Sequence, residues 1–196
     1  MKHIILALAV VAMALSSCGQ NDKKTKSETE TQTQTQEKQE MKTLVAYFSA
    51  SGVTRGIAEK LAKVTNATLY EIKPEVLYTD ADLDWTNKQS RSSVEMADHD
   101  SRPAFVTDLE NAADYDCIFI GFPIWWYTAP TIINTFLDTY DFSGKTVIFF
   151  ATSGGSSLDK ANAQFREQYP NLNWIDGKTL NGASEADIKA WVETLR

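Results

Sequence analysis

The chain has 196 residues and a formal net charge of -7 at pH 7. This acidic balance argues against nucleic acid as a partner, because a phosphate backbone binds basic surfaces. Beyond residue 18 the sequence contains one histidine, His99, and one cysteine, Cys117, which nearly excludes a zinc cluster and a serine–histidine hydrolase. We therefore expect no metal ligand and no catalytic side chain, and we expect Cys117 to be a buried structural thiol.

Residues 1–17 predict a secretion signal of the lipoprotein type. Lys2 and His3 precede an apolar run, residues 4–15, that is shorter than a membrane span of about 20 residues but suits the core of a signal peptide. The sequence that follows, up to Cys18, resembles the cleavage box of bacterial lipoproteins, in which the cysteine becomes the lipidated first residue. The alternative is an ordinary signal peptide with a chance cysteine.

Residues 18–41 are expected to form a tether between the lipidated Cys18 and the folded part of the chain. Residues 19–40 contain no apolar side chain, so they cannot bury enough surface to offset the entropy lost on ordering. Acyl chains on Cys18 would make the lipid membrane a partner. We therefore expect a membrane-anchored lipoprotein on the periplasmic side or at the cell surface.

Strand and helix patterns alternate along residues 42–196, which have the size of one domain. Strands that alternate with helices require a parallel α/β sheet with right-handed crossovers. Five strands are expected, the first at the start of residues 44–54 and the others at residues 67–72, 116–121, 145–151 and 174–180. The expected helices are residues 55–64, 87–96, 130–140, 156–168 and 184–195.

A long polar section, residues 75–103, separates the second strand from the third. Loops of this length inside a compact domain are usually functional or mobile. We expect the section to fold over the loop ends of the sheet, with Tyr78 and Trp85 among its few anchors; surface decoration is the alternative.

Residues 44–54, LVAYFSASGVT, pass from strand through a tight loop into a helix. Such a loop gathers unpaired backbone N–H groups at the positive end of a helix dipole, which favours an anion. Ser49, Ser51 and Thr54 would add hydroxyl donors, and Gly52 would let the backbone approach a ligand closely. The alternative is that the hydroxyls only cap the helix.

This loop lacks two nucleotide-binding motifs. It has no GxxxxGK(S/T) pattern, so no lysine can reach terminal phosphates, and it is not the GxGxxG loop that binds dinucleotides. Its SxSGxT spacing resembles the phosphate loop of flavodoxins, which holds the 5′-phosphate of FMN with hydroxyls and amides and no cationic side chain.

A second loop, FPIWWYTAP at residues 122–130, contains three adjacent aromatic residues between prolines. They cannot all point into the core, so at least one of Trp125, Trp126 and Tyr127 should be exposed to a ligand. A flat heteroaromatic ring is the natural partner for such a side chain. Alternatively, one tryptophan fills the core and the other covers a helix end.

A third loop, TSGGSS at residues 152–157, also follows a buried strand. Gly154 and Gly155 would offer backbone amides to the edge of a ring, or they would simply form a turn. In a doubly wound sheet the ligand lies beyond the carboxyl ends of the strands, where all three loops should meet.

Together the three loops resemble the flavodoxin superfamily over residues 42–196, and the PIWW and TSGG segments resemble flavodoxin-like proteins of bacterial genomes. The resemblance implies a three-layer flavodoxin-like fold with a five-stranded parallel sheet in the order 2-1-3-4-5, helices on both faces and FMN as cofactor. The residues that it assigns to FMN are Ser49, Ser51, Gly52, Val53 and Thr54 for the phosphate, Pro123, Ile124, Trp125, Trp126 and Tyr127 for the ribityl chain and ring, and Thr152, Ser153, Gly154 and Gly155 for the ring edge.

One departure from the flavodoxin pattern affects the expected function. Electron-carrier flavodoxins usually stack a tyrosine of the third loop on the flavin, whereas this loop has no aromatic residue, so one flavin face is open unless Trp85 or Tyr78 covers it. We expect an FMN-binding electron-transfer protein that serves a redox partner protein or a small-molecule acceptor such as a quinone. The alternatives are an FMN-dependent NAD(P)H:quinone-type oxidoreductase and a cofactor-free binding module that uses the aromatic patch of residues 125–127.

Overall fold

The computed structural model describes residues 41–195. The predicted signal peptide of residues 1–17, the lipidation site Cys18 and all but the last residue of the predicted tether lie outside the described residues and stay predictions. Across residues 41–195, no helix combines the length and apolar character that a membrane crossing requires.

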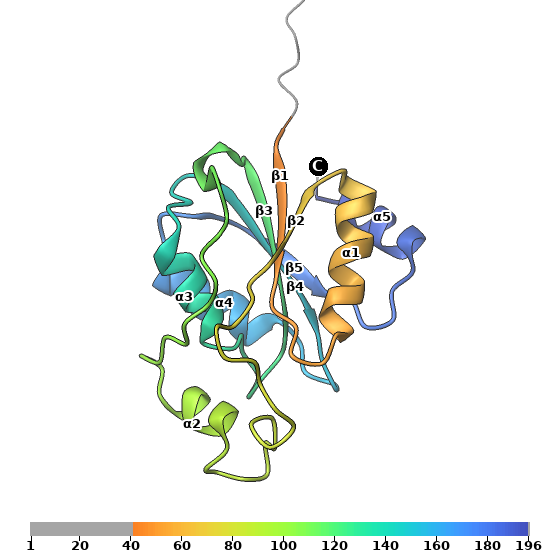
Figure 1. Ribbon diagram of the computed structural model, residues 1–196. Helices are drawn as coiled ribbons and strands as arrows, with labels where there is room; N and C mark the ends of the chain where they lie inside the picture. Colours follow the sequence, from red (N-terminus) through yellow and green to blue (C-terminus); the bar gives the residue numbers. More distant parts are fainter. Residues whose placement is uncertain (1–40, 196) are drawn as a thin grey trace, which may run out of the picture. The chain divides into compact units, whose positions relative to one another are not determined.

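Five parallel strands form one sheet. The strands are β1 (Thr43–Tyr47), β2 (Thr68–Glu71), β3 (Cys117–Pro123), β4 (Thr146–Thr152) and β5 (Asn173–Thr179). Strand β1 pairs with β2 and β3, β3 with β4, and β4 with β5. The predicted order 2-1-3-4-5 is therefore confirmed (Figure 1).

Helices cover both faces of the sheet. The helices of residues 41–195 are α1 (Val53–Thr65), α2 (Arg91–Ala97), α3 (Ile132–Thr139), α4 (Asp159–Gln168) and α5 (Glu185–Glu193), with a short 3-10 helix, η1 (Ala112–Asp114). Helices α1 and α5 lie on one face, and α3 and α4 lie on the other (Figure 1). The predicted three-layer flavodoxin-like fold is therefore confirmed.

The helix ends follow local sequence signals. Helix α5 begins after Ser184, whose Oγ accepts the N–H of Asp187 while the Asp187 carboxylate accepts the N–H of Ser184. Helix α3 begins at Ile132, two residues later than expected, because the turn after Pro130 precedes it. Helix α4 begins three residues later than expected, because residues 156–158 belong to the loop before it.

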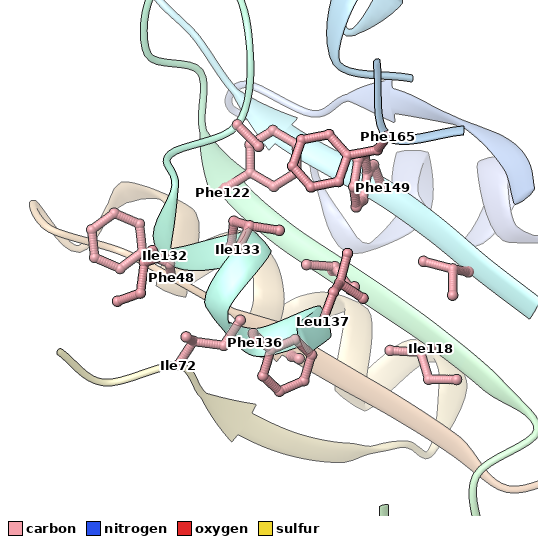
Figure 2. Close-up of a cluster of buried hydrophobic side chains, with 14 of the residues drawn as sticks. Phe48, Ile72, Ile118, Phe122, Ile132, Ile133, Phe136, Leu137, Phe149 and Phe165 are labelled. Atoms are coloured by element: carbon pink, nitrogen blue, oxygen red, sulfur yellow. The ribbon is translucent and has the colours of Figure 1, made fainter. Parts of the chain in front are cut away.

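Apolar side chains of the central strands point alternately to the two faces, as the two-residue period of a strand requires. Leu44 and Ile118 lie in the core under α3 and α4, whereas Val45 and Phe119 lie in the core under α1 and α5. Figure 2 shows the first of these cores, in which side chains of α3 lie over the strands. The labelled residues of this core include Ile118, Phe122, Ile133, Phe136, Leu137 and Phe149.

The polar section after β2 forms a loop that is closed at its base. The N–H of Glu75 donates to the carbonyl of Ala104 over 3.1 Å, and the N–H of Val106 donates to the carbonyl of Lys73 over 2.9 Å. We call residues 75–104 the insert. Figure 1 shows α2, which belongs to the insert, beyond the same end of the sheet as the β1–α1 loop.

Helix α2 is shorter than the expected helix of residues 87–96. The N–H of Ser90 donates to the carbonyl of Asn87, so the residues before α2 form a turn. Ser90 then caps the helix, because its Oγ accepts the N–H of Ser93.

Candidate functional site

Three loops leave the carboxyl ends of neighbouring parallel strands. Loop 1 (residues 48–52) follows β1, loop 2 (residues 124–131) follows β3, and loop 3 (residues 153–158) follows β4. Hydrogen bonds join the starts of loops 1 and 2 to the neighbouring strands, from the N–H of Phe48 to the carbonyl of Gly121 in β3 over 2.8 Å and from the N–H of Ile124 to the carbonyl of Thr152 in β4 over 2.9 Å. The structure thus brings together the three loops that the sequence singled out.

Loop 1 turns through Gly52, whose φ of 84° lies in the left-handed region that glycine adopts without strain. Helix α1 then begins at Val53 with no side-chain cap, so the alternative that the loop hydroxyls cap the helix is wrong. Within residues 41–195, no backbone N–H from residue 49 to residue 55 donates a hydrogen bond. These donors lie at the positive end of α1, where they can bind an anion.

The hydroxyl of Ser49 is the second feature of loop 1. Its Oγ is buried and has no hydrogen-bond partner among the described residues. Burying an unpaired hydroxyl is unfavourable by about 1–3 kcal/mol, so this oxygen marks a place where a polar ligand atom would be stabilising. Ser51 and Val53 are exposed at the outside of the turn.

The first turn of α1 offers no unpaired cationic side chain to an anion in loop 1. Arg55, in the first turn of α1, forms an ion pair with Glu71 at 2.6 Å. An anion bound here would therefore be held by amides and hydroxyls.

Two buried threonines connect loop 1 with loop 3. Oγ1 of Thr54 lies 2.8 Å from Oγ1 of Thr152, and the two residues are 1% and 5% exposed. The assignment of Thr54 to the phosphate and of Thr152 to the ring edge stays a prediction. In the structure the two hydroxyls point at each other and hold the start of α1 to the end of β4.

Loop 2 contains a tight turn of unusual composition. The N–H of Trp125 donates to the carbonyl of Thr128 over 3.0 Å, and the N–H of Thr128 donates back over 2.9 Å. The two central residues, Trp126 and Tyr127, have φ values of 46° and 68°, as in a type I′ turn. Left-handed backbone is unfavourable for bulky residues by about 1–2 kcal/mol each, so this turn is strained.

The three aromatic residues of loop 2 have different surroundings. Trp126 is 41% exposed and Tyr127 is 67% exposed, whereas Trp125 is half-buried. The Trp125 ring makes edge-to-face contacts with Phe48 at 5.5 Å and with Tyr78 at 5.4 Å. One tryptophan therefore packs against the core, and its neighbour is exposed.

A side chain from beyond β5 holds loop 3. The N–H of Ser153 donates to Oδ1 of Asn181 over 2.8 Å, and Nδ2 of Asn181 donates to the carbonyl of Ser153. Oγ of Ser153 in turn accepts the N–H groups of Gly155 and Ser156. Of the loop amides predicted to meet a ring edge, only that of Gly154 has no partner among the described residues.

Two contacts that support the loops could not be predicted from the sequence. Asn181 lies 28 residues after Ser153, and the only local signal was an Asn-Gly turn after the fifth strand. Oγ1 of Thr128 donates to Oε1 of Gln164 over 3.0 Å, which ties loop 2 to α4. No motif predicts this pair, because the two residues lie 36 positions apart.

Three further observations concern the domain outside the three loops. Cys117 is buried, as the sequence predicts, and burial raises the pKa of its thiol to about 11. The described part of the chain contains no group of three or more potential metal-ligating side chains. A hollow of about 270 Å³ between residues 137–142 and 169–172 lies where β4 and β5 begin, at the opposite end of the sheet from the three loops.

A family model described as Flavodoxin matches residues 42–195. The chain belongs to the flavodoxin family. The predicted membership is thus confirmed, and the sheet order and loop positions described above are those of a flavodoxin. No protein in the comparison with curated proteins matches the chain.

Three solved structures resemble this flavodoxin-family domain. A Bacteroides eggerthii DSM 20697 protein provisionally named a flavoprotein is 52% identical, with a TM-score of 0.76, and the match covers 78% of this chain and 96% of that one. A protein of the same description from Bacteroides uniformis ATCC 8492 is 55% identical, with a TM-score of 0.76 and coverage of 78% and 98%. A flavoprotein in complex with FMN from Lactobacillus acidophilus NCFM is 28% identical, with a TM-score of 0.61 and coverage of 78% and 99%.

Proposed function

We propose that this flavodoxin-family chain binds FMN between the three loops and transfers electrons. The observation that carries the proposal is the buried, unpaired Oγ of Ser49 beside a run of free backbone N–H groups at the start of α1. Family membership and the FMN complex of the Lactobacillus relative support FMN as the ligand.

The residues present fit the phosphate of FMN. Gly52 has no atom within 4 Å of the position that a Cβ would take, so the turn leaves room for a ligand. Ser49, Ser51 and the amides of residues 49–55 would hold the phosphate, and charge-assisted hydrogen bonds of this kind stabilise by about 1.5–3 kcal/mol each.

The residues present also fit a flat ring. Trp126 offers an exposed indole on a turn whose strain is typical of functional sites. The free N–H of Gly154 would meet the ring edge. When bound, FMN supplies reversible electron transfer, as single electrons or as hydride, and the protein binds it, orients it and sets its potential. A neutral phosphate loop and an acidic chain disfavour an anionic reduced flavin and so lower that potential.

A second function, an NAD(P)H:quinone-type oxidoreductase, is favoured because no aromatic side chain of loop 3 would cover the flavin. Loop 3 has no aromatic residue, and Tyr78 contacts Trp125 and donates to Glu95 over 2.6 Å. Trp85 is 74% exposed. A flavin face that no aromatic side chain covers suits hydride transfer from a dinucleotide to a quinone.

We also propose that the protein is a membrane-tethered lipoprotein. The support is the sequence of residues 1–40, in which the signal-peptide pattern of residues 1–17 precedes Cys18 and residues 19–40 contain no apolar side chain. The tether would keep the domain near a membrane-bound or protein redox partner. Labelling with a radioactive fatty acid tests this proposal, because Cys18→Ser should abolish both the label and the membrane association.

Titration of the purified protein with FMN tests the first proposal. We expect a yellow complex with a Kd at or below the micromolar range, and weaker binding of riboflavin, which lacks the phosphate that loop 1 would hold. A protein that stays colourless at micromolar FMN contradicts the proposal and favours the cofactor-free binding module.

Stopped-flow mixing of the FMN complex with NADH separates the two redox functions. The flavin of an electron carrier stays oxidised until a separate reductase is added. Rapid bleaching by NADH alone, followed by reoxidation on addition of a quinone, would establish the reductase instead.

A further inference from the structure

We propose that Tyr78, from the insert, is a positioning residue that holds the aromatic turn of loop 2 in its ligand-binding conformation. The proposal rests on the proposed function, because the ligand in question is FMN. It gives the insert a defined role in the site: the insert supports the turn through one aromatic ring.

The Tyr78 ring lies in a group of three aromatic side chains from three different segments. Its centroid is 5.6 Å from that of Phe48 and 5.4 Å from that of Trp125, both in edge-to-face geometry. Phe48 and Trp125 are also in contact, at 5.5 Å. The group therefore joins the end of β1, the start of the loop 2 turn and the insert.

The insert fixes Tyr78 through polar contacts of its own. The Tyr78 hydroxyl donates to Oε2 of Glu95 over 2.6 Å, and Nε of Arg91 donates to Oε1 of the same carboxylate over 2.7 Å. The Arg91 guanidinium carbon also lies 3.9 Å from the Tyr78 ring centroid, and its Nη1 donates to the carbonyl of Val76 over 2.6 Å. Both charged side chains come from α2, so α2 sets the direction of the ring.

Trp125 needs such support because it is the first residue of the strained turn. The two hydrogen bonds between Trp125 and Thr128 close the turn around Trp126 and Tyr127, both at positive φ. A conformation of this kind persists only where surrounding contacts determine it. Thr128 is held through Gln164, and Trp125 is held through Phe48 and Tyr78.

Hydrogen exchange of the flavin-free protein tests the proposal independently of FMN. Tyr78→Leu removes two aromatic contacts, so we expect exchange at the N–H groups of Trp125 and Thr128 to accelerate about tenfold. In a parallel titration, we expect the Kd for FMN to rise by about tenfold and the flavin to keep more of its fluorescence at saturation, because Trp126 is less well placed against the ring.

Tyr70→Leu is the matched control. The Tyr70 hydroxyl donates to the carbonyl of Val106, just beyond the insert, and its ring stacks on Phe136, but Tyr70 has no aromatic contact with Trp125. We expect this variant to leave both the exchange at loop 2 and the affinity for FMN within about twofold of the unmodified protein.

The outcomes separate this proposal from the proposed function. Equal effects of Tyr78→Leu and Tyr70→Leu, or no effect of Tyr78→Leu, would overturn the positioning role. If Tyr78→Leu does not fold, Tyr78→Phe decides: about threefold faster exchange at the turn supports the proposal, and unchanged exchange overturns it. If the unmodified protein does not bind FMN, the proposed function fails while the exchange experiment still decides the role of Tyr78.

Discussion

The hydroxyls of Thr54 and Thr152 lie 2.8 Å apart in the interior of the domain, where they join the first turn of α1 to the end of β4. The pair connects the loop that would hold a phosphate with the loop that would meet a ring edge. One hydroxyl donates to the other, so the two loops are coupled through one buried hydrogen bond.

We predict that Thr152→Val lowers the free energy of unfolding by about 1–3 kcal/mol. The substitution keeps the size of the side chain but leaves the buried Thr54 hydroxyl without a partner. Urea unfolding of the flavin-free protein measures the change. The double variant Thr54→Val/Thr152→Val should recover most of the loss, because it leaves no unpaired hydroxyl; losses that simply add would contradict the coupling.

We predict that Ser49→Ala has opposite effects on stability and on affinity. In the flavin-free protein, the substitution removes a buried hydroxyl that has no partner among the described residues, so stability should stay unchanged or rise by about 1 kcal/mol. The affinity for FMN should fall about tenfold, because the phosphate loses a donor. Thermal unfolding and fluorescence titration measure the two quantities.

Ser51→Ala serves as the control for the stability measurement alone, because Ser51 is exposed and we expect its removal to leave stability unchanged. A Ser49→Ala variant that is destabilised without FMN would show that this hydroxyl has a partner in the folded protein, and the phosphate assignment of loop 1 would lose its main support.

Two substitutions at Trp126 separate backbone strain from ring stacking. Trp126→Ala and Trp126→Gly both remove the indole, so both should weaken FMN binding by about fivefold or more. The glycine variant also relieves the strain of a φ of 46°, so it should be about 1 kcal/mol more stable than the alanine variant. Chemical denaturation of the two flavin-free variants gives the difference, and equal stabilities would argue against a strained turn.

The raised pKa of Cys117 predicts a loss of stability at alkaline pH. Burial, with a smaller effect of Asp116, raises the pKa of the thiol from 9.0 to about 11, so the folded chain keeps this proton at a pH at which the unfolded chain has lost it. The contribution of the Cys117 thiol to the free energy of unfolding is therefore full below about pH 9. It is lost between pH 9 and about 11, with a slope of up to about 1.4 kcal/mol per pH unit.

Unfolding measurements across this pH range check the prediction, with Cys117→Ala as the comparison. The variant should lose less stability than the unmodified protein between pH 9 and 10, before the buried tyrosines contribute; burial raises the pKa of Tyr169 to about 12, for example. Parallel pH profiles for the two proteins would contradict the role assigned to the thiol.

The sequence predicted the order of the strands in the sheet only through its resemblance to flavodoxins. By itself it determined the alternation of strands and helices along the chain and the position of three loops at one edge of the sheet. These features follow from local signals: apolar runs such as residues 145–151, the helical spacing of residues 55–64, and the small hydroxylated residues between strand and helix. The capping box of Ser184 and Asp187 was predictable for the same reason, because its two residues lie three positions apart.

Only the tertiary structure decided which contacts the side chains of the loops make. Thr54 meets Thr152 from 98 positions away, and Asn181 holds Ser153 across 28 positions. Trp125 and Trp126 are adjacent residues of the same type, yet one packs against Tyr78 and the other is exposed. The direction of a side chain in a loop depends on backbone dihedrals and on neighbours that the folded sheet brings together, and neither is encoded in short-range spacing.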